Sequence, residues 1–162
     1  MTASTIKKIS LATILLSGLL VGTLDILSAF VDFYIAKGKN PTVILNYIAG
    51  AAVDKTTSAG TGGALIGLLF HYTIAFAFTF LFFWLYPRVN WMSKNWVITG
   101  IIYGLFIWVM VNQVILRFTN LTIPPINKID PMKASKAALI LICMIGLPLS
   151  YIAYRNSKKN TV

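Results

Sequence analysis

The chain has 162 residues, of which 57% are hydrophobic and 11% charged, and its mean hydropathy is +0.79. Soluble domains average roughly 45–50% apolar and about 25% charged residues, so this composition indicates an integral membrane protein. The formal net charge is +10, but the basic residues separate the apolar runs instead of gathering in one segment. That distribution argues against a nucleic-acid-binding surface and is typical of membrane-protein loops that face anionic lipid headgroups.

The first apolar segment, residues 9–36, is predicted to be an uncleaved transmembrane helix. It follows a basic start, as a secretory signal would, but it continues to Ala36. A cleavage before Phe30 would place Leu27 at the −3 position, where signal peptidase requires a small residue. The segment exceeds the roughly 20 residues that cross a bilayer, so the helix is expected to tilt or to extend beyond the membrane.

The linker after this span predicts a short amphipathic helix over residues 41–52. Asn40 is a plausible N-cap, and Pro41 suits the first helical position. Apolar residues then follow at helical spacing, which favours a helix lying at the membrane interface. The next stretch, "SAGTGG", lacks the Gly-Lys-Ser/Thr ending of a phosphate-binding loop.

Three further spans are predicted over residues 62–86, 95–118 and 135–154. The aromatic run "FAFTFLFFWLY" at the end of the second span is interpreted as lipid-facing surface. Asp130 followed by Pro131 is a start signal for the last helix, and Pro148 is expected to kink it. Because backbone groups in lipid must bond within their own segment, the sequence predicts an all-α four-helix bundle in a single transmembrane domain.

The charge pattern leaves the orientation open. We expect a multi-pass protein of the bacterial inner membrane with both termini cytoplasmic, because the basic residues near each end are compact. The two sides nevertheless carry equal numbers of basic residues, so dual topology remains an alternative. One side holds Lys7, Lys8, Arg88, Lys94, Arg155, Lys158 and Lys159, and the other holds Lys37, Lys39, Lys55, Arg117, Lys128, Lys133 and Lys136.

Each of the first three spans contains a Gly-x-x-x-Gly motif. Small residues four apart remove side-chain bulk from one helix face and let a neighbouring helix approach closely. Three motifs in three spans therefore predict a tightly packed bundle, and oligomerisation with further copies is expected. The packing residues are Gly18 and Gly22, Gly63 and Gly67, and Gly100 and Gly104.

Two aspartates interrupt the first apolar run. At about 100° per residue, Asp25 and Asp32 share a face with the glycines of that span, and His71 shares a face with those of the second. The polar groups should therefore point into the bundle and form a polar seam there, which Asn112 and Gln113 of the third span would extend. An Asp–His contact would lower the cost of burying both groups. The seam is either an interhelical clamp or a proton or ion relay.

The sequence offers no support for metal, cofactor or enzyme chemistry. It contains one histidine, one cysteine and no glutamate, so no ligand cluster and no nucleophile–base arrangement can be recognised. Cys143 is interpreted as a small core residue. We therefore expect no cofactor and no catalytic residue.

The motifs "GTLD", "NPTVILNYIAG", "GTGGALIGLLFHYTIAFAF" and "YPRV" together resemble the YagU-like family of small bacterial inner-membrane proteins. The resemblance covers most of residues 18–88. It implies a multispan inner-membrane protein with no assigned reaction, and it directs attention to a set of positions in this chain, while Asp32 lies outside the pattern. Those positions are Gly22, Asp25, Pro41, Gly63, Gly67 and His71.

Two functions are compatible with these observations. The first is a non-enzymatic membrane protein whose polar seam packs the bundle or an oligomer, with the lipid bilayer as its other partner. The second is a small proton-coupled transporter or proton-responsive protein that uses Asp25 and His71. The sequence identifies no ligand for either.

Overall fold

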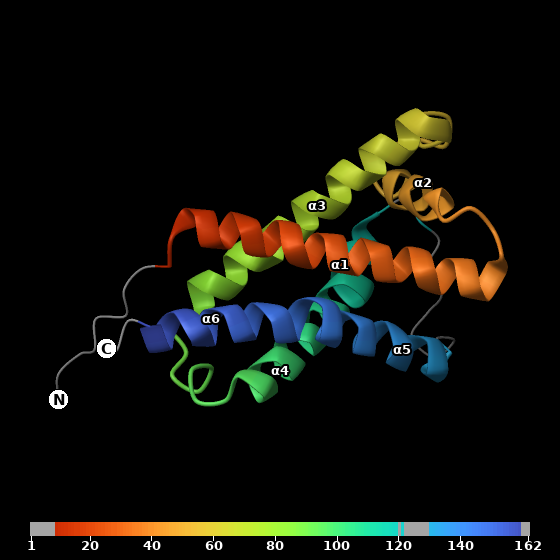
Figure 1. Cartoon of the computed structure of the whole chain (residues 1–162). Coiled ribbons are helices and arrows are strands. Elements are labelled where there is room, and N and C mark those ends of the chain that lie inside the picture. The colour runs from red at the N-terminus through yellow and green to blue at the C-terminus, as the bar shows by residue number, and fades with distance from the viewer. Residues whose placement is uncertain (1–8, 120, 122–129, 160–162) are drawn as a thin grey trace.

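The computed structural model describes residues 9–119, 121 and 130–159, and within these ranges every regular element is helical. This confirms the predicted all-α class. Figure 1 shows the helices in chain order. The α-helices are α1 (Leu11–Lys37), α2 (Thr42–Gly50), α3 (Gly60–Leu85), α4 (Trp96–Val109), α5 (Pro131–Leu141) and α6 (Leu147–Lys159).

Four of the described helical segments are long and apolar enough to cross a membrane: Leu11–Lys37, Gly60–Leu85, Trp96–Phe118 and Pro131–Lys158. The first three agree with the predicted spans to within two residues. The fourth begins four residues earlier than predicted, because Asp130 caps it by accepting a hydrogen bond from the Met132 N–H at 3.0 Å, with Pro131 in the first turn. The Asp130-Pro131 start signal therefore located the beginning of this helix better than hydropathy did.

The predicted linker helix is present as α2, one residue shorter at its start and two at its end than expected. The side chain of Asn40 accepts hydrogen bonds from both the N–H and the hydroxyl of Thr42. Leu45 and Ala49 are buried, and α2 packs chiefly against α3. The helix therefore covers one end of the bundle.

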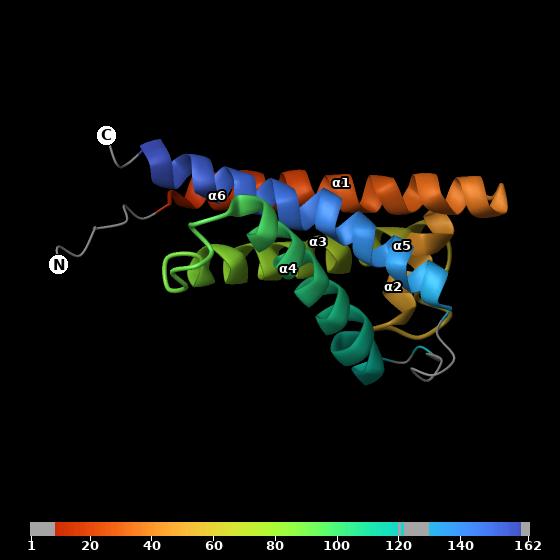
Figure 2. The same cartoon turned by 90° about the horizontal axis from the view of Figure 1, so that it is seen from below.

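The two ends of the bundle differ. At one end, called here the turn end, lie the start of α1, the end of α6 and the turn between α3 and α4; at the other, the α2 end, lie α2, the end of α1 and the start of α5 (Figure 1, Figure 2). The chain thus starts and finishes its described helices on one side, as an even number of spans requires. Lys7, Lys8 and Lys128 of the charge comparison lie outside the described residues.

The hydrophobic core fills the turn-end half. Phe82, Tyr86, Met92, Leu149 and Ala153 are all at most 4% exposed there. The aromatic run of α3 contributes much of this core, so the prediction that the run faces lipid was wrong for half of it.

The reason is helical phase. Phe78 and Phe82 lie four residues apart on the face toward α4, and Phe83 is also buried, whereas Phe80 and Trp84 are exposed. Hydropathy does not distinguish an aromatic ring that packs against protein from one that packs against lipid.

Two helices change pitch within their length. The α4 segment continues as a π-helical turn (η1, Met110–Val114) and a 3-10 turn (η2, Ile115–Phe118), and another π-helical turn (η4, Ile142–Gly146) joins α5 to α6. The η4 turn ends two residues before Pro148, whose ring nitrogen has no hydrogen to donate to the preceding turn. Figure 2 shows the far end of the α4 segment slanting away from α1, α5 and α6.

Glycines occupy the closest helix–helix contacts. A Cβ placed on Gly67 would lie 1.9 Å from the carbonyl oxygen of Leu45 in α2, and one on Gly146 would lie 2.1 Å from the carbonyl oxygen of Gly100 in α4. Gly104 meets the backbone of Ile142 in the same way, at 2.5 Å from its Cα. These distances are too short for any side chain, so the glycines set the spacing between the helices.

The glycines of the first span also lie at close contacts, but their neighbours are side chains of α3 instead of backbone atoms. A Cβ on Gly18 would lie 2.5 Å from the ring of Phe76, and one on Gly22 would lie 3.0 Å from the ring of Tyr72. Gly63 makes room for the backbone of Ser58, at 2.0 Å from its oxygen. All six predicted packing glycines therefore lie at close contacts.

Substituting Gly67 should measure this constraint. We expect Gly67→Ala to lower the free energy of unfolding by about 1–3 kcal/mol, since the new methyl group must displace the backbone of α2. Gly62→Ala is the matched control, because a Cβ at Gly62 meets nothing within 4 Å. Reversible unfolding in mixed micelles gives both values, and equal stability of the two variants would contradict the packing described.

Candidate functional site

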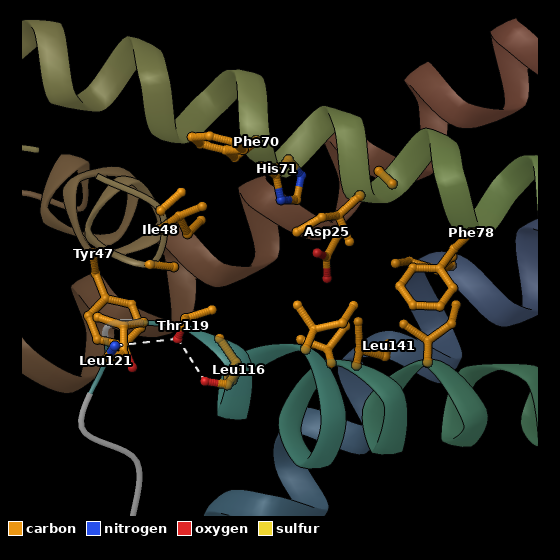
Figure 3. A pocket seen from close by; sticks show the side chains of 18 residues that line it. Asp25, Tyr47, Ile48, Phe70, His71, Phe78, Leu116, Thr119, Leu121 and Leu141 are labelled. Carbon is orange, nitrogen blue, oxygen red and sulfur yellow. Dashed lines mark hydrogen bonds between the residues drawn. The ribbon is translucent and has the colours of Figure 1, made fainter. Parts of the chain in front are cut away.

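Asp25 and His71 lie near the middles of their helices and face the interior of the bundle. Asp25 is fourteen residues from the start of α1, or roughly 21 Å at the usual helical rise. Both residues are partly buried, and both line one cavity of about 350 Å³. Figure 3 shows the Asp25 carboxylate and the His71 ring projecting into this cavity from α1 and α3. The structure thus places the acid and the imidazole between helices, away from the outer surface.

His71 joins α3 to the backbone of α1. Its Nε2 lies 2.8 Å from the carbonyl oxygen of Gly22. A carbonyl can only accept, so Nε2 carries a hydrogen and donates it. The missing side chain of Gly22 is what lets α3 come near enough for this bond.

A second hydrogen bond lies next to the first. The hydroxyl oxygens of Thr23 and Tyr72 are 2.7 Å apart. Thr23 also donates to the carbonyl oxygen of Leu19 at 2.7 Å, so Tyr72 is the donor to Thr23. The pairs His71–Gly22 and Tyr72–Thr23 together form what we call the α1–α3 clamp.

The predicted contact between Asp25 and His71 takes a different form. The two side chains share the cavity, but the hydrogen bond of His71 goes to a backbone carbonyl and not to the carboxylate. Within the described part of the chain, no hydrogen bond or ion pair to the Asp25 carboxylate is found. The clamp therefore does not need Asp25, and the carboxylate is available to another partner.

The cavity extends from the middle of the bundle toward the α2 end, and its wall is mainly apolar. It lies where the α4 segment slants away and α2 covers the opening between α3 and that segment. Apart from Asp25 and His71, the polar lining groups are the hydroxyls of Tyr47 and Thr119. The apolar lining includes Ile48, Phe70, Phe78, Val111, Leu141 and Ile145.

A second cavity, of about 730 Å³, lies between α1 and α5 and also reaches Asp25. It contains Asp32, which pairs with Lys136 of α5, and it is lined by Lys37 and Lys133 as well. Asp32 is therefore not part of a seam with His71. Its partner is a lysine near the α2 end, a feature that helix phase alone did not indicate.

Asn112 and Gln113 are not brought to Asp25. The Asn112 amide donates to the carbonyl oxygen of Trp108 at 2.9 Å, and Gln113 accepts from Arg117 at 3.3 Å. Neither residue lines the two cavities. Extending the seam to these residues was therefore wrong, because both lie in the η1 turn, where the wider π-helical pitch changes the direction of successive side chains.

Tyr103 makes a contact that the sequence did not specify. Its hydroxyl donates to the carbonyl oxygen of Phe78 at 2.6 Å, and the residue is 5% exposed. The bond joins α4 to α3, as His71 joins α3 to α1. In both cases a polar side chain of one span donates to a backbone carbonyl of the preceding span.

The described residues contain no group of three His, Cys, Asp or Glu side chains that could hold a metal ion. Cys143 is exposed, so its interpretation as a core residue was wrong. It lies in the η4 turn on the outer side of the fourth span.

Comparison of the chain with protein-family models, with curated proteins and with solved structures gives no match.

Removing the imidazole should weaken the α1–α3 clamp. We expect His71→Ala to lower the free energy of unfolding by about 0.6–2 kcal/mol, the range for interhelical hydrogen bonds in membranes. Thr73→Val is the control, since Thr73 bonds only to Leu69 one turn earlier in its own helix, at 2.8 Å. A His71→Ala protein as stable as Thr73→Val would show that the bond contributes nothing.

Proposed function

We propose that this chain is a small, non-enzymatic protein of the bacterial inner membrane that binds and releases a proton at Asp25, as a proton-coupled transporter or a proton-responsive protein. The supporting observation is the position of the Asp25 carboxylate. It lies at mid-span, where both cavities meet, and none of the described residues forms a hydrogen bond or ion pair with it. Ionisable groups placed in this way within a membrane commonly act in ion or proton pathways.

The asymmetry of the bundle supports the same proposal. Both cavities extend from Asp25 toward the α2 end, while the turn-end half is filled by the core that includes Phe82 and Leu149. A carboxylate with space on one side and dense packing on the other has the geometry of a carrier in one of its two access states. The pitch changes at η1 and η4 border the cavity and are places where the helices can bend.

A purely structural seam is the second candidate, and the α1–α3 clamp favours it. The clamp accounts for His71 without any transport function. It does not account for Asp25, which makes no hydrogen bond to the clamp and whose burial has a cost. For this reason we assign packing to His71 and proton binding to Asp25.

The affiliation with YagU-like proteins and the formation of homo-oligomers are further parts of this proposal. The four motifs between residues 18 and 88 support the first. The number of spans supports the second, because four helices enclose little space for a transport pathway on their own.

Proton movement in vesicles tests the assignment of Asp25. Purified protein is reconstituted into liposomes that contain a pH-sensitive dye, and a pH gradient is imposed. We expect the wild type to dissipate the gradient and Asp25→Asn to match empty liposomes, since the amide cannot carry a proton. Asp54→Asn is the control: Asp54 lies in the linker, lines neither cavity, and accepts hydrogen bonds from the N–H groups of Thr56 and Thr57 at 3.0 Å.

The outcomes separate the two candidates. Flux in the wild type and in Asp54→Asn, but not in Asp25→Asn, supports proton binding at Asp25. Wild-type flux in Asp25→Asn contradicts it. If no version moves protons and Asp25→Asn unfolds as easily as His71→Ala, the structural function replaces the proposed one.

A further inference from the structure

The first cavity has one carboxylate and neither lysine nor arginine in its described lining. Asp25 is the one Asp, Glu, Lys or Arg residue in its described lining, while Tyr47, His71 and Thr119 are the other polar residues and the rest is apolar. The second cavity is lined by Lys37, Lys133 and Lys136 as well as by Asp25 and Asp32, and Asp32 pairs with Lys136. The first cavity therefore favours a cation more than the second does, because lysines outnumber aspartates only in the second.

Aromatic rings line the same cavity as the carboxylate. Phe70 and Phe78 of α3 and Tyr47 of α2 line the same cavity as Asp25, together with the His71 ring (Figure 3). The face of an aromatic ring attracts a cation, most strongly where water is displaced. A carboxylate with aromatic rings around it is the environment that proteins offer to ammonium groups with organic substituents.

The size and polarity of the cavity narrow the ligand class. At about 350 Å³ it lies at the small end of the range for ligand pockets, about 300–1,000 Å³. An inorganic ion would lose its water shell and gain only one carboxylate from the described lining, which contains no cluster suited to a metal. An ammonium ion with apolar substituents loses little hydration and fills the apolar wall.

We propose that the cavity between α1, α2, α3 and the α4 segment binds a small lipophilic organic cation of the ammonium class, with its charge at Asp25 and its apolar groups against Phe70, Phe78 and Ile48. This inference rests on the proposed function, in which Asp25 is the functional residue of the cavity, and it names the ligand class for that site.

Binding of benzyltrimethylammonium tests the proposal. Titration calorimetry is carried out on the protein in lipid nanodiscs, and heats from empty nanodiscs are subtracted. We expect saturable binding to the wild type and to Asp54→Asn. Binding to Asp25→Asn should be at least about tenfold weaker, because the amide removes the charge while keeping the shape. Benzenesulfonate, an anion of similar size, should not bind.

A second variant retains the carboxylate. Phe70→Leu should weaken benzyltrimethylammonium binding by at least about threefold, through loss of the ring face. It provides the test if Asp25→Asn elutes as aggregate or loses its helical circular dichroism. In that case, unchanged affinity in Phe70→Leu overturns the proposal.

The remaining outcomes are equally decisive. Absence of wild-type binding, equal affinity in folded Asp25→Asn, or equal binding of benzenesulfonate would each overturn the cation site. Proton flux that depends on Asp25, combined with no cation binding, would leave the proposed function standing and remove only this inference. Cation binding without proton flux would leave this inference standing and remove the proposed function.

Discussion

The close approach of helix backbones at glycine is the constraint on which the rest of the structure depends. Where Gly67, Gly100, Gly104 and Gly146 meet a neighbouring segment, no Cβ would fit. Close approach also brings backbone carbonyls within reach of side chains on the next helix. The His71–Gly22 bond uses this at the α1–α3 contact, whereas the long Tyr103 side chain reaches the Phe78 carbonyl oxygen between α3 and α4, where none of the described glycines lies. At the α1–α3 contact, packing and the interspan hydrogen bond are thus two results of one sequence feature.

This arrangement also explains why the middle of the bundle contains an available carboxylate. Because a backbone carbonyl satisfies His71, the histidine does not need the acid. The slant of the α4 segment after η1 then leaves space beside Asp25 instead of a packed interface (Figure 2). The hydrophobic core of the turn-end half, which includes Phe82 and Leu149, closes that space on one side.

The sequence predicted the spans, the linker helix and the packing glycines well, because length, hydropathy and four-residue spacing report directly on helices in a membrane. It could not identify the acceptor for His71: helix phase gives a face, but any exposed carbonyl on the adjoining span can accept. It placed half of the aromatic run on the wrong surface, since lipid and protein interior are equally apolar. It misplaced Asn112 and Gln113, because their polarity alone did not show that they bond to Trp108 and Arg117 within their own segment. The Asp32–Lys136 pair joins helices far apart in the chain, and no local pattern reports such a pair.

The most direct test of this account is the distance between the His71 ring and the Gly22 carbonyl in the membrane. His71 is the only histidine in the chain, so histidine ¹⁵N-labelled in the ring alone and carbonyl-¹³C-labelled glycine allow a dipolar-recoupling measurement by solid-state NMR in lipid bilayers. The account predicts that one glycine carbonyl is dephased by the ring nitrogen, as the N···O separation of 2.8 Å requires, and that the signal disappears in Gly22→Ala. Absence of any coupled glycine carbonyl, or a coupling that persists in Gly22→Ala, would contradict it.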